Sequence, residues 1–396
     1  MKKICVITGS RAEYGLLSGL MTAIKKDPTL LLQVIATNMH LSPEFGLTYK
    51  EIENDGFTID KKVEMLLSSD TSNGTTKSVG LATIGFADAY EDLKPDLIVV
   101  LGDRYEILAA VTAALFYKIP VAHLHGGEIS EGAYDDSIRH AITKLSHLHF
   151  TSTESYRNRV IQLGENPDRV FYVGAIGVEN IKNTPLLSKR ELEENLQFEL
   201  GEKSFLVTYH PVTLEISTAK QQCESLLSAL SEYNDYRIVF TYPNSDTDGR
   251  IIIQLIEEYV SKNKDRCMAI NSLGRIRYYS ALQYVSAVIG NSSSGIIEVP
   301  SFGIPTLNIG DRQKGRIASN SVVHCGTAIE DIKSGLLEVT SQSIRSIASK
   351  KLNPYHLDGT TNRIVKILKE YPLKQIIQKK FYNTNNERLS KIHHTR

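Results

Sequence analysis

The chain has 396 residues, of which 41% are hydrophobic and 23% are charged, and its 45 Lys and Arg residues balance its 45 Asp and Glu residues. This length suits two domains of ordinary size. The balanced charge offers no field to attract nucleic acid or an anionic membrane, and no apolar run approaches the roughly 18 residues of a membrane helix. We therefore expect a cytoplasmic protein without nucleic-acid or membrane partners.

Cysteine usage indicates neither a disulfide framework nor a zinc site. The four cysteines are far apart and lack CxxC or Cys/His spacing; they are Cys5, Cys223, Cys267 and Cys325. Isolated cysteines of this kind commonly serve as small buried hydrophobic residues. We expect neither a metal ion nor a cofactor.

The first apolar run, residues 4–7, leads directly into Gly-Ser-Arg, and its shortness favours a first buried strand over a signal peptide. Similar Val- and Ile-rich runs follow at residues 34–37, 97–101, 121–124 and 171–173. The spacers carry helix-period apolar residues, as in residues 107–114. Because continuous apolar runs are typical of strands buried on both faces, the pattern predicts a parallel sheet covered by helices.

The same pattern repeats in the second half, with apolar runs at residues 205–208, 238–241, 268–270, 287–289 and 306–309. We expect an α/β fold of two Rossmann-like, doubly wound domains, residues 1–180 and 181–370, followed by a polar tail, residues 371–396. The helical pattern at residues 362–370 leaves open a return to the first domain. Ligands of such sheets bind at the carboxyl ends of the strands, so the chemistry is expected in the cleft between the domains.

Three serines, Ser292, Ser293 and Ser294, lie between an apolar run that ends at Gly290 and an amphipathic stretch that opens at Gly295. A single serine at such a junction commonly caps a helix. Three serines bracketed by glycines supply several hydroxyl and N–H donors, the glycines allow close approach to a ligand, and a helix start adds a positive dipole end. The segment therefore predicts a phosphate site.

The residues after the serines extend this prediction to a nucleotide diphosphate. Glu298 lies one helical turn further on, where an acidic residue suits a ribose diol. A segment with several basic residues, which ends at Arg316, follows the next apolar run. NAD is disfavoured, because the turn after the first strand lacks GxGxxG spacing.

Carboxylates collect after the strands of the first domain: Asp103, Glu128, Asp135 and Asp136. Asp103 and Asp135 are also good helix N-caps, which is the alternative interpretation. Glu128 follows two glycines in a flexible turn, where a carboxylate contributes little to the stability of the fold, so a functional role is favoured. Because several acids beside a cleft raise one another's pKa, the group predicts proton transfer.

Three histidines lie in or next to predicted strands. His123 and His125 lie on the same face of a predicted strand, a spacing that metal-binding histidines also have. Buried histidines more often form hydrogen bonds within the protein, and this is our interpretation. His210 precedes a proline at a strand end and would face the cleft from the second domain; a loop-capping role is the alternative.

Six segments in this order closely resemble the UDP-N-acetylglucosamine 2-epimerases: GSRAEYG, LGDRYE, HLHGGE, DDSIRHAITKLSHLHF, HPVT and GNSSSGIIEVPSFGIPTLNIGDRQKGR. The resemblance covers about residues 1–370 and is strongest to the hydrolysing branch, which forms N-acetylmannosamine for bacterial sialic acid. It implies a glycosyltransferase-B-type fold with the nucleotide sugar between the domains. It also implies loss of UDP from C1 coupled to loss of the C2 proton, giving a 2-acetamidoglucal that water then hydrates.

The resemblance also implies roles for individual residues. Asp103, Glu128 and Asp135 match catalytic carboxylates, with Asp136 able to replace Asp135, and His210 matches a catalytic-site histidine. The implied nucleotide-sugar-binding residues are Arg11, Ser292, Ser293, Ser294, Gly295, Glu298 and Arg316. Which carboxylate takes the proton and which returns it stays open.

The assignment to a branch of the family, and to a substrate, depends on smaller sequence differences. GSRAEYG in place of a GTRPE-like start, and His210-Pro211 in place of His-Arg, favour hydrolysis. Residues 39–57 are similar to relatives in legionaminic-acid pathways, which implies a GDP-linked or a 2,4-diacetamido-trideoxy sugar as alternative substrates. Family members are commonly dimers or tetramers, so a homo-oligomer is expected. A glycosyltransferase and a non-catalytic nucleotide-sugar sensor are rival functions, and neither needs three carboxylates.

Overall fold

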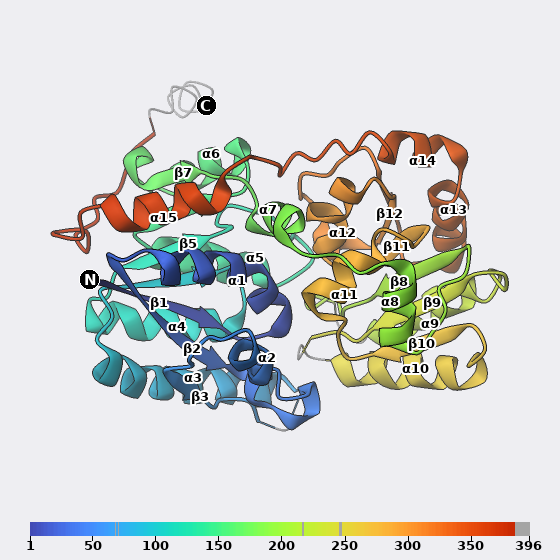
Figure 1. Ribbon diagram of the computed structural model, residues 1–396, viewed down its shortest axis with the longest axis horizontal. Helices are drawn as coiled ribbons and strands as arrows, with labels where there is room; N and C mark the ends of the chain where they lie inside the picture. Colours follow the sequence, from blue (N-terminus) through green and yellow to red (C-terminus); the bar gives the residue numbers. More distant parts are fainter. Residues whose placement is uncertain (68, 70, 216–217, 245–247, 385–396) are drawn as a thin grey trace, which may run out of the picture.

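The computed structural model describes residues 1–67, 69, 71–215, 218–244 and 248–384. Within these residues, two parallel β-sheets covered by helices form two lobes (Figure 1). The first sheet has seven strands in the order β3-β2-β1-β4-β5-β6-β7. They are β1 (Lys2–Thr8), β2 (Leu30–Thr37), β3 (Lys61–Val63), β4 (Leu97–Leu101), β5 (Val121–Leu124), β6 (Leu148–Thr151) and β7 (Val170–Tyr172).

The second sheet has six strands in the order β10-β9-β8-β11-β12-β13. They are β8 (Ser204–Thr208), β9 (Arg237–Thr241), β10 (Cys267–Ile270), β11 (Ala287–Gly290), β12 (Thr306–Ile309) and β13 (Val322–Cys325). The order reverses between β1 and β4 in one sheet and between β8 and β11 in the other. At such a switch point the flanking connections run to opposite faces and leave a crevice at the carboxyl ends of the strands. The expected pair of doubly wound α/β sheets is confirmed.

Helices connect the strands and cover both faces of each sheet. They are α1 (Arg11–Lys26), α2 (Tyr49–Asn54), α3 (Ser72–Leu93), α4 (Tyr105–Tyr117), α5 (Asp135–Leu145), α6 (Glu154–Gln162), α7 (Ile176–Asn183), α8 (Lys189–Leu196), α9 (Ala219–Leu230), α10 (Gly249–Lys262), α11 (Gly274–Ala281), α12 (Ser294–Ile297), α13 (Ile329–Val339), α14 (Gln342–Ala348) and α15 (Thr360–Glu370). Short 3₁₀ turns are η1 (Asn38–Leu41), η2 (Pro43–Phe45), η3 (Pro167–Arg169), η4 (Val299–Phe302) and η5 (Asp311–Gln313). None of the described helices is long and apolar enough to cross a membrane.

Apolar strand residues are buried on both faces of each sheet, because helices pack from both sides. In β1, Ile4 and Val6 enter one core and Cys5 and Ile7 enter the other. Cys223 and Cys267 are likewise buried, in the core of the second lobe, and Cys325 is partly buried. Three of the four cysteines therefore occupy the buried positions expected of them.

The last helix, α15, returns to the first lobe, as the red end of the described chain shows in Figure 1. It packs against α1 and α7, and Ile364 and Leu368, one turn apart, are fully buried in the core around β1. The apolar stripe of α15 is buried on α1, which favours the return to the first domain that the helical pattern at residues 362–370 left open. We propose a first domain built from residues 1–180 and 360–384.

The segment after α15 also differs from the polar tail expected over residues 371–396. Ile376 is buried in the first-lobe core, and Lys379 Nζ donates to Glu165 Oε1 at 2.8 Å. The segment packs against the first lobe because Ile376 is apolar and enters an apolar core, and because the Lys379 ammonium pairs with the Glu165 carboxylate. The remainder of the expected tail, residues 385–396, lies outside the described residues.

Candidate active site

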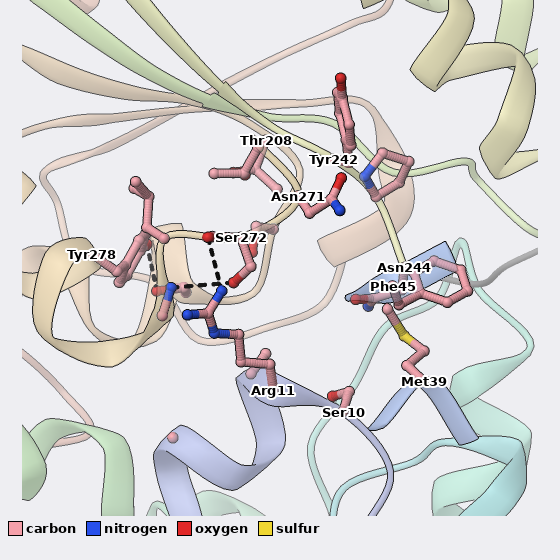
Figure 2. Close-up of a pocket in the computed structure, with 18 of the residues that line it drawn as sticks. Ser10, Arg11, Met39, Phe45, Thr208, Tyr242, Asn244, Asn271, Ser272 and Tyr278 are labelled. Carbon is pink, nitrogen blue, oxygen red and sulfur yellow. Dashed lines mark hydrogen bonds between the residues drawn. The ribbon is translucent and has the colours of Figure 1, made fainter. Parts of the chain in front are cut away.

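A cavity of about 290 Å³ lies between the two lobes at the carboxyl ends of the strands. Residues that follow β1 and β2 line it from the first lobe, and residues that follow β8, β9, β10 and β11 line it from the second. Figure 2 shows Arg11 reaching from the first lobe towards Ser272 of the second, with Phe45 further along the cavity. The cavity therefore extends from the ends of β1 and β2 to the switch point between β8 and β11.

Arg11, the first residue of α1, bridges the lobes beside this cavity. Its Nη1 donates to the carbonyl oxygen of Ser272 at 2.9 Å, and its Nε donates to Glu51 Oε2 at 2.7 Å. Arg11 lines the cavity, as expected of a phosphate-side arginine. However, the Glu51 carboxylate already neutralises the Arg11 guanidinium. Arg11 therefore attracts an anionic ligand less strongly than an unpaired arginine would.

The three serines form a turn after β11, and all of them line the cavity: Ser292, Ser293 and Ser294. Gly290 ends the strand with φ +133°, and a Cβ there would overlap the carbonyl oxygen of Thr208 in β8, so this position requires glycine. The expected helix is only the four-residue α12. Because so short a helix has little dipole, backbone and hydroxyl donors must carry any phosphate binding here.

Glu298, expected at a ribose, lines the cavity and is 5% exposed. Burial raises the pKa of its carboxyl to about 7, and its Oε2 has no hydrogen-bond partner among the described residues. A buried acceptor that lacks a partner is suited to the hydroxyls of a ribose. Gly295, in contrast, does not line the cavity: a Cβ there would lie 2.8 Å from Thr306 Cγ2, so this glycine serves packing against β12 rather than approach to a ligand.

His210 follows β8 and lines the cavity beside the serine turn. Its backbone N–H donates to Asn291 Oδ1 at 2.7 Å, and Asn291 Nδ2 donates back to the His210 carbonyl at 2.8 Å. The backbone N–H of Asn244 donates to His210 Nδ1 at 3.4 Å. The Asn291 contacts hold the His210 backbone beside the cavity, and the Asn244 contact is made to the ring.

Glu128 follows β5 and is almost fully buried. Its Oε1 accepts from His125 Nδ1 at 2.8 Å and from the Ser152 hydroxyl at 2.6 Å, and its Oε2 accepts from Arg316 Nη1 at 2.6 Å. Burial acts to raise its pKa, but the charge of Arg316 and the His125 contact hold the pKa well below its usual range. Arg316 therefore reaches across the lobes and keeps Glu128 ionised. The sequence predicts Arg316 to bind the nucleotide, but it does not line the cavity.

Asp103 is joined to Glu128 through Arg139 of α5. The fully buried Arg139 forms an ion pair with Asp103, and its Nη1 donates to the Glu128 carbonyl oxygen at 2.9 Å. Burial opposes ionisation of Asp103, but Arg139 and then Arg316 lower its pKa below the usual value. Two of the three expected catalytic carboxylates are thus ionised side by side. Neither they nor Asp135 line the cavity itself.

The structure separates the two neighbouring aspartates at the start of α5. Asp136 Oδ1 accepts from the Ser130 N–H at 2.7 Å and from Arg139 Nη1 at 3.1 Å, and its Oδ2 lies 3.4 Å from His140 Nε2. Asp136 is therefore committed to holding the loop before α5. Asp135 is buried at the first position of the helix.

His123 is buried and hydrogen-bonded, as the sequence interpretation predicts. Its Nε2 donates to the Gly102 carbonyl at 2.7 Å, and its Nδ1 lies 3.3 Å from the Thr143 hydroxyl. Burial lowers its pKa to about 3. Within the described part of the chain, no group of three or more His, Cys, Asp or Glu side chains is placed to hold a metal ion.

Sequence reasoning missed two arginines that the structure brings to the site. Arg139 stands four residues after Asp135 on an amphipathic helix, and a lone arginine on a buried face was the available signal. Arg312 of η5 lines the cavity, and its Nη1 donates to the Asn291 carbonyl at 3.1 Å. Among the described residues Arg312 has no carboxylate partner, so its charge is available to a ligand. It lies in the basic segment that ends at Arg316.

The fold and the site together define a two-lobed α/β protein with a nucleotide-sized cavity beside ionised carboxylates. The sequence model of the family "UDP-N-acetylglucosamine 2-epimerase" matches residues 22–369, well over half of the chain. The chain therefore belongs to the UDP-N-acetylglucosamine 2-epimerase family, as the resemblance indicated.

Curated relatives narrow the comparison to the hydrolysing branch. The chain is 43% identical to the GDP/UDP-N,N'-diacetylbacillosamine 2-epimerase (hydrolyzing) of Campylobacter jejuni, over 96% of this chain and 98% of the relative. It is 38% identical to the polysialic acid biosynthesis protein P7 of Escherichia coli, over 94% of each chain. The crystal structure of the UDP-GlcNAc 2-epimerase from Neisseria meningitidis bound to UDP-GlcNAc superposes with TM-score 0.77, covering 93% of this chain and 99% of that one, at 20% identity. That last likeness shows the common fold.

Proposed function

We propose that this protein is a hydrolysing 2-epimerase of nucleotide-linked 2-acetamido sugars, converting UDP-N-acetylglucosamine and water to UDP and N-acetylmannosamine. One observation carries the proposal: ionised carboxylates, joined by Arg139 and Arg316, adjoin a cavity that bears the serine turn and Glu298. A nucleotide-sugar sensor would use the serine turn and Glu298 but would have no use for the carboxylates. The same carboxylates argue against a glycosyltransferase.

The proposed chemistry needs a base and a stabilised leaving group. The C2 proton is not next to a carbonyl, so its removal must be coupled to departure of UDP from C1, which takes the electrons of the C1–O bond. The resulting 2-acetamidoglucal then gains a hydroxyl at C1 from water and a proton at C2 from the opposite face. We assign the proton transfers to Asp103, Glu128 and Asp135.

The remaining assignments follow from the cavity lining. We assign the diphosphate to Ser292, Ser293 and Arg312, because electrostatic stabilisation of the leaving group requires donors and a cation that no carboxylate already neutralises. We assign the ribose to Glu298, whose Oε2 lacks a partner. His210 would contact the sugar end from the second lobe. No step requires a metal ion or a cofactor.

Proton NMR in deuterated water tests the proposal directly. Purified protein is incubated with UDP-N-acetylglucosamine, and free N-acetylmannosamine carrying deuterium at C2 is the expected product. Product without deuterium at C2 would rule out elimination, and UDP-linked N-acetylmannosamine would rule out hydrolysis. Binding of UDP without turnover of any donor would support the sensor instead.

A second substrate is favoured by the relative that is 43% identical, whose name specifies N,N'-diacetylbacillosamine. The alternative activity is the same hydrolytic epimerisation of a UDP-2,4-diacetamido-2,4,6-trideoxy sugar or of GDP-N-acetylglucosamine, in a legionaminic-acid pathway. Parallel NMR samples with these donors decide between the substrates. The donor with the highest kcat/KM is the preferred substrate.

We also propose a homo-oligomer in the cytoplasm. The four cysteines are free, which fits a reducing compartment. Large apolar side chains are exposed at the end of α4, where Leu115 is 48% and Phe116 is 76% exposed. A second copy of the chain would cover them in an isologous dimer. Light scattering should give a dimer or tetramer for the wild type and a smaller species for Phe116→Glu; a monomeric wild type would contradict the proposal.

A further inference from the structure

Two buried glutamates lie behind the turn that carries Arg11 into the cavity. Glu13 of α1 is 5% exposed and Glu106 of α4 is 0% exposed, and both face Gly9 at the end of β1. The Gly9 N–H donates to Glu13 Oε2 at 2.5 Å. A Cβ at Gly9 would overlap the Glu106 carboxylate, so glycine is required for this close approach. The proposed chemistry makes no use of either acid.

The two carboxylates have too few partners to be ionised together. Glu13 Oε1 and both carboxylate oxygens of Glu106 have no hydrogen-bond partner among the described residues. Arg104 Nε is 3.5 Å from Glu106 Oε1, beyond good hydrogen-bond distance. Two buried carboxylates whose oxygens lack hydrogen-bond donors ionise separately, because the second charge has neither solvent nor a partner.

We propose that Glu13 and Glu106 share one proton, and that the resulting acid–carboxylate pair positions the turn of Gly9, Ser10 and Arg11 at the nucleotide cavity. In this pair the Glu13 Oε1–H donates to Glu106 while Glu13 Oε2 accepts from the Gly9 N–H. The arrangement supplies partners for two of the three oxygens that lack them. The inference rests on the proposed function, since Ser10 and Arg11 line the cavity assigned to the nucleotide.

The surrounding charges place the loss of this proton near neutral to mildly alkaline pH. Burial, and then the charge of Glu106, raise the pKa of Glu13 to about 8. From η1, His40 faces the same turn, and its ring contacts the Thr8 hydroxyl. Burial lowers the His40 pKa to about 4, so this ring stays neutral throughout the alkaline range. The shared proton is therefore the group that titrates in this range.

Loss of the proton should weaken nucleotide binding. Above the pKa of Glu13, two like charges face each other and the pair no longer holds the turn. If only the protonated form binds, the KM and the Kd for UDP rise about tenfold for each pH unit above the midpoint. Turnover at saturating substrate should change little, because the acids position the turn and do not touch the reacting atoms.

Glutamine variants test the inference. In Glu13→Gln the neutral amide accepts from Gly9 N–H and donates to Glu106 at every pH, which imitates the shared-proton state. Glu106→Gln removes the second charge and serves if the first variant fails to fold. Glu53→Gln is the matched control, because this glutamate of α2 is partly exposed and pairs with Lys62 outside the cavity. The Kd for UDP, by calorimetry, and the KM are measured from pH 6 to 9.5.

The wild type and Glu53→Gln should both lose affinity above about pH 8, whereas Glu13→Gln and Glu106→Gln should hold a constant KM. Any titration of the ligand itself affects all four proteins alike. An unchanged alkaline loss in both glutamine variants would overturn the inference, as would a wild type that binds UDP equally at all pH values. A wild type that binds no UDP at any pH would instead overturn the proposed function, and this inference with it.

Discussion

Glu128 is the residue whose surroundings most restrict its chemistry. With Arg316, His125 and Ser152 around it, the carboxylate is anionic at any working pH, so it is available as a base or as a charge that stabilises a developing cation. Glu128→Gln should lower kcat by about 10²- to 10⁴-fold while leaving the UDP affinity within a few-fold. Steady-state kinetics and calorimetry measure the two effects.

The same variant leaves the buried Arg316 without its counter-ion, so a lower melting temperature is also expected. Activity must therefore be measured well below that temperature. Turnover close to the wild type in a folded protein would exclude Glu128 from the mechanism.

The adjacent aspartates of α5 should separate into a reactive and a structural residue. Asp135→Asn should lower kcat, whereas Asp136→Asn should chiefly lower the free energy of unfolding, by about 1–3 kcal/mol, because it weakens contacts to Arg139 and Ser130. Burial opposes ionisation of Asp136, yet its contacts with His140, Ser130 and Arg139 lower its pKa to about 2.

This lowered pKa sets the pH dependence of the Asp136 contribution. The contribution is complete above the unfolded pKa near 4 and is lost as the pH falls through about 2. The stability difference between the wild type and Asp136→Asn should therefore be constant at neutral pH and shrink in acid, which denaturant titrations at several pH values can follow. A large kcat loss confined to Asp136→Asn would reverse the assignment.

At the scale of elements, the junction between β11 and α12 depends on one glycine. Gly290→Ala would force a Cβ into the Thr208 carbonyl at a φ that L residues rarely adopt, so a loss of about 2–5 kcal/mol is expected. Gly80→Ala in α3 is the control, because a Cβ there meets nothing within 4 Å. The control should be neutral or stabilising by about 0.5–1 kcal/mol. Equal stability of the two variants would contradict the account of this junction.

Elements with continuous apolar runs could be predicted from the sequence, and those without such runs could not. The apolar runs predicted β1, β2, β4, β5 and β7 to β12, and all of these except the edge strands β7 and β10 are largely buried between helices. β3 and β13 lie at sheet edges and are short, and β6 begins Leu-His-Phe, so none of the three has such a run.

Some residues of the candidate site could likewise be predicted from the sequence, and others could not. Residues at strand ends, such as His210 and Ser293, could be placed from their position alone. Arg139 and Arg312 could not, because their roles depend on side-chain direction and on which carboxylates already neutralise Arg11 and Arg316.

At the scale of the whole molecule, the end of the chain holds the first lobe together although its sequence follows the second. Ile364 and Leu368 of α15 and then Ile376 are buried in the core around β1, and Lys379 adds a third cationic or imidazole partner to Glu165 beside Lys144 and His149. A chain that ends at residue 370 loses the last two of these contacts. Burial of Ile376 alone is worth about 2–5 kcal/mol on truncation.

A chain that ends at residue 384 keeps every described contact and is the matched control for this truncation. The shorter chain should unfold at lower denaturant concentration than the control. Its extra hydrogen exchange should appear in β1, α1 and β6 rather than in β8 or β11, since the lost contacts all belong to the first lobe. Exchange raised equally in both lobes would show instead that the C-terminal segment stabilises the junction between them, and the first domain would then end before α15.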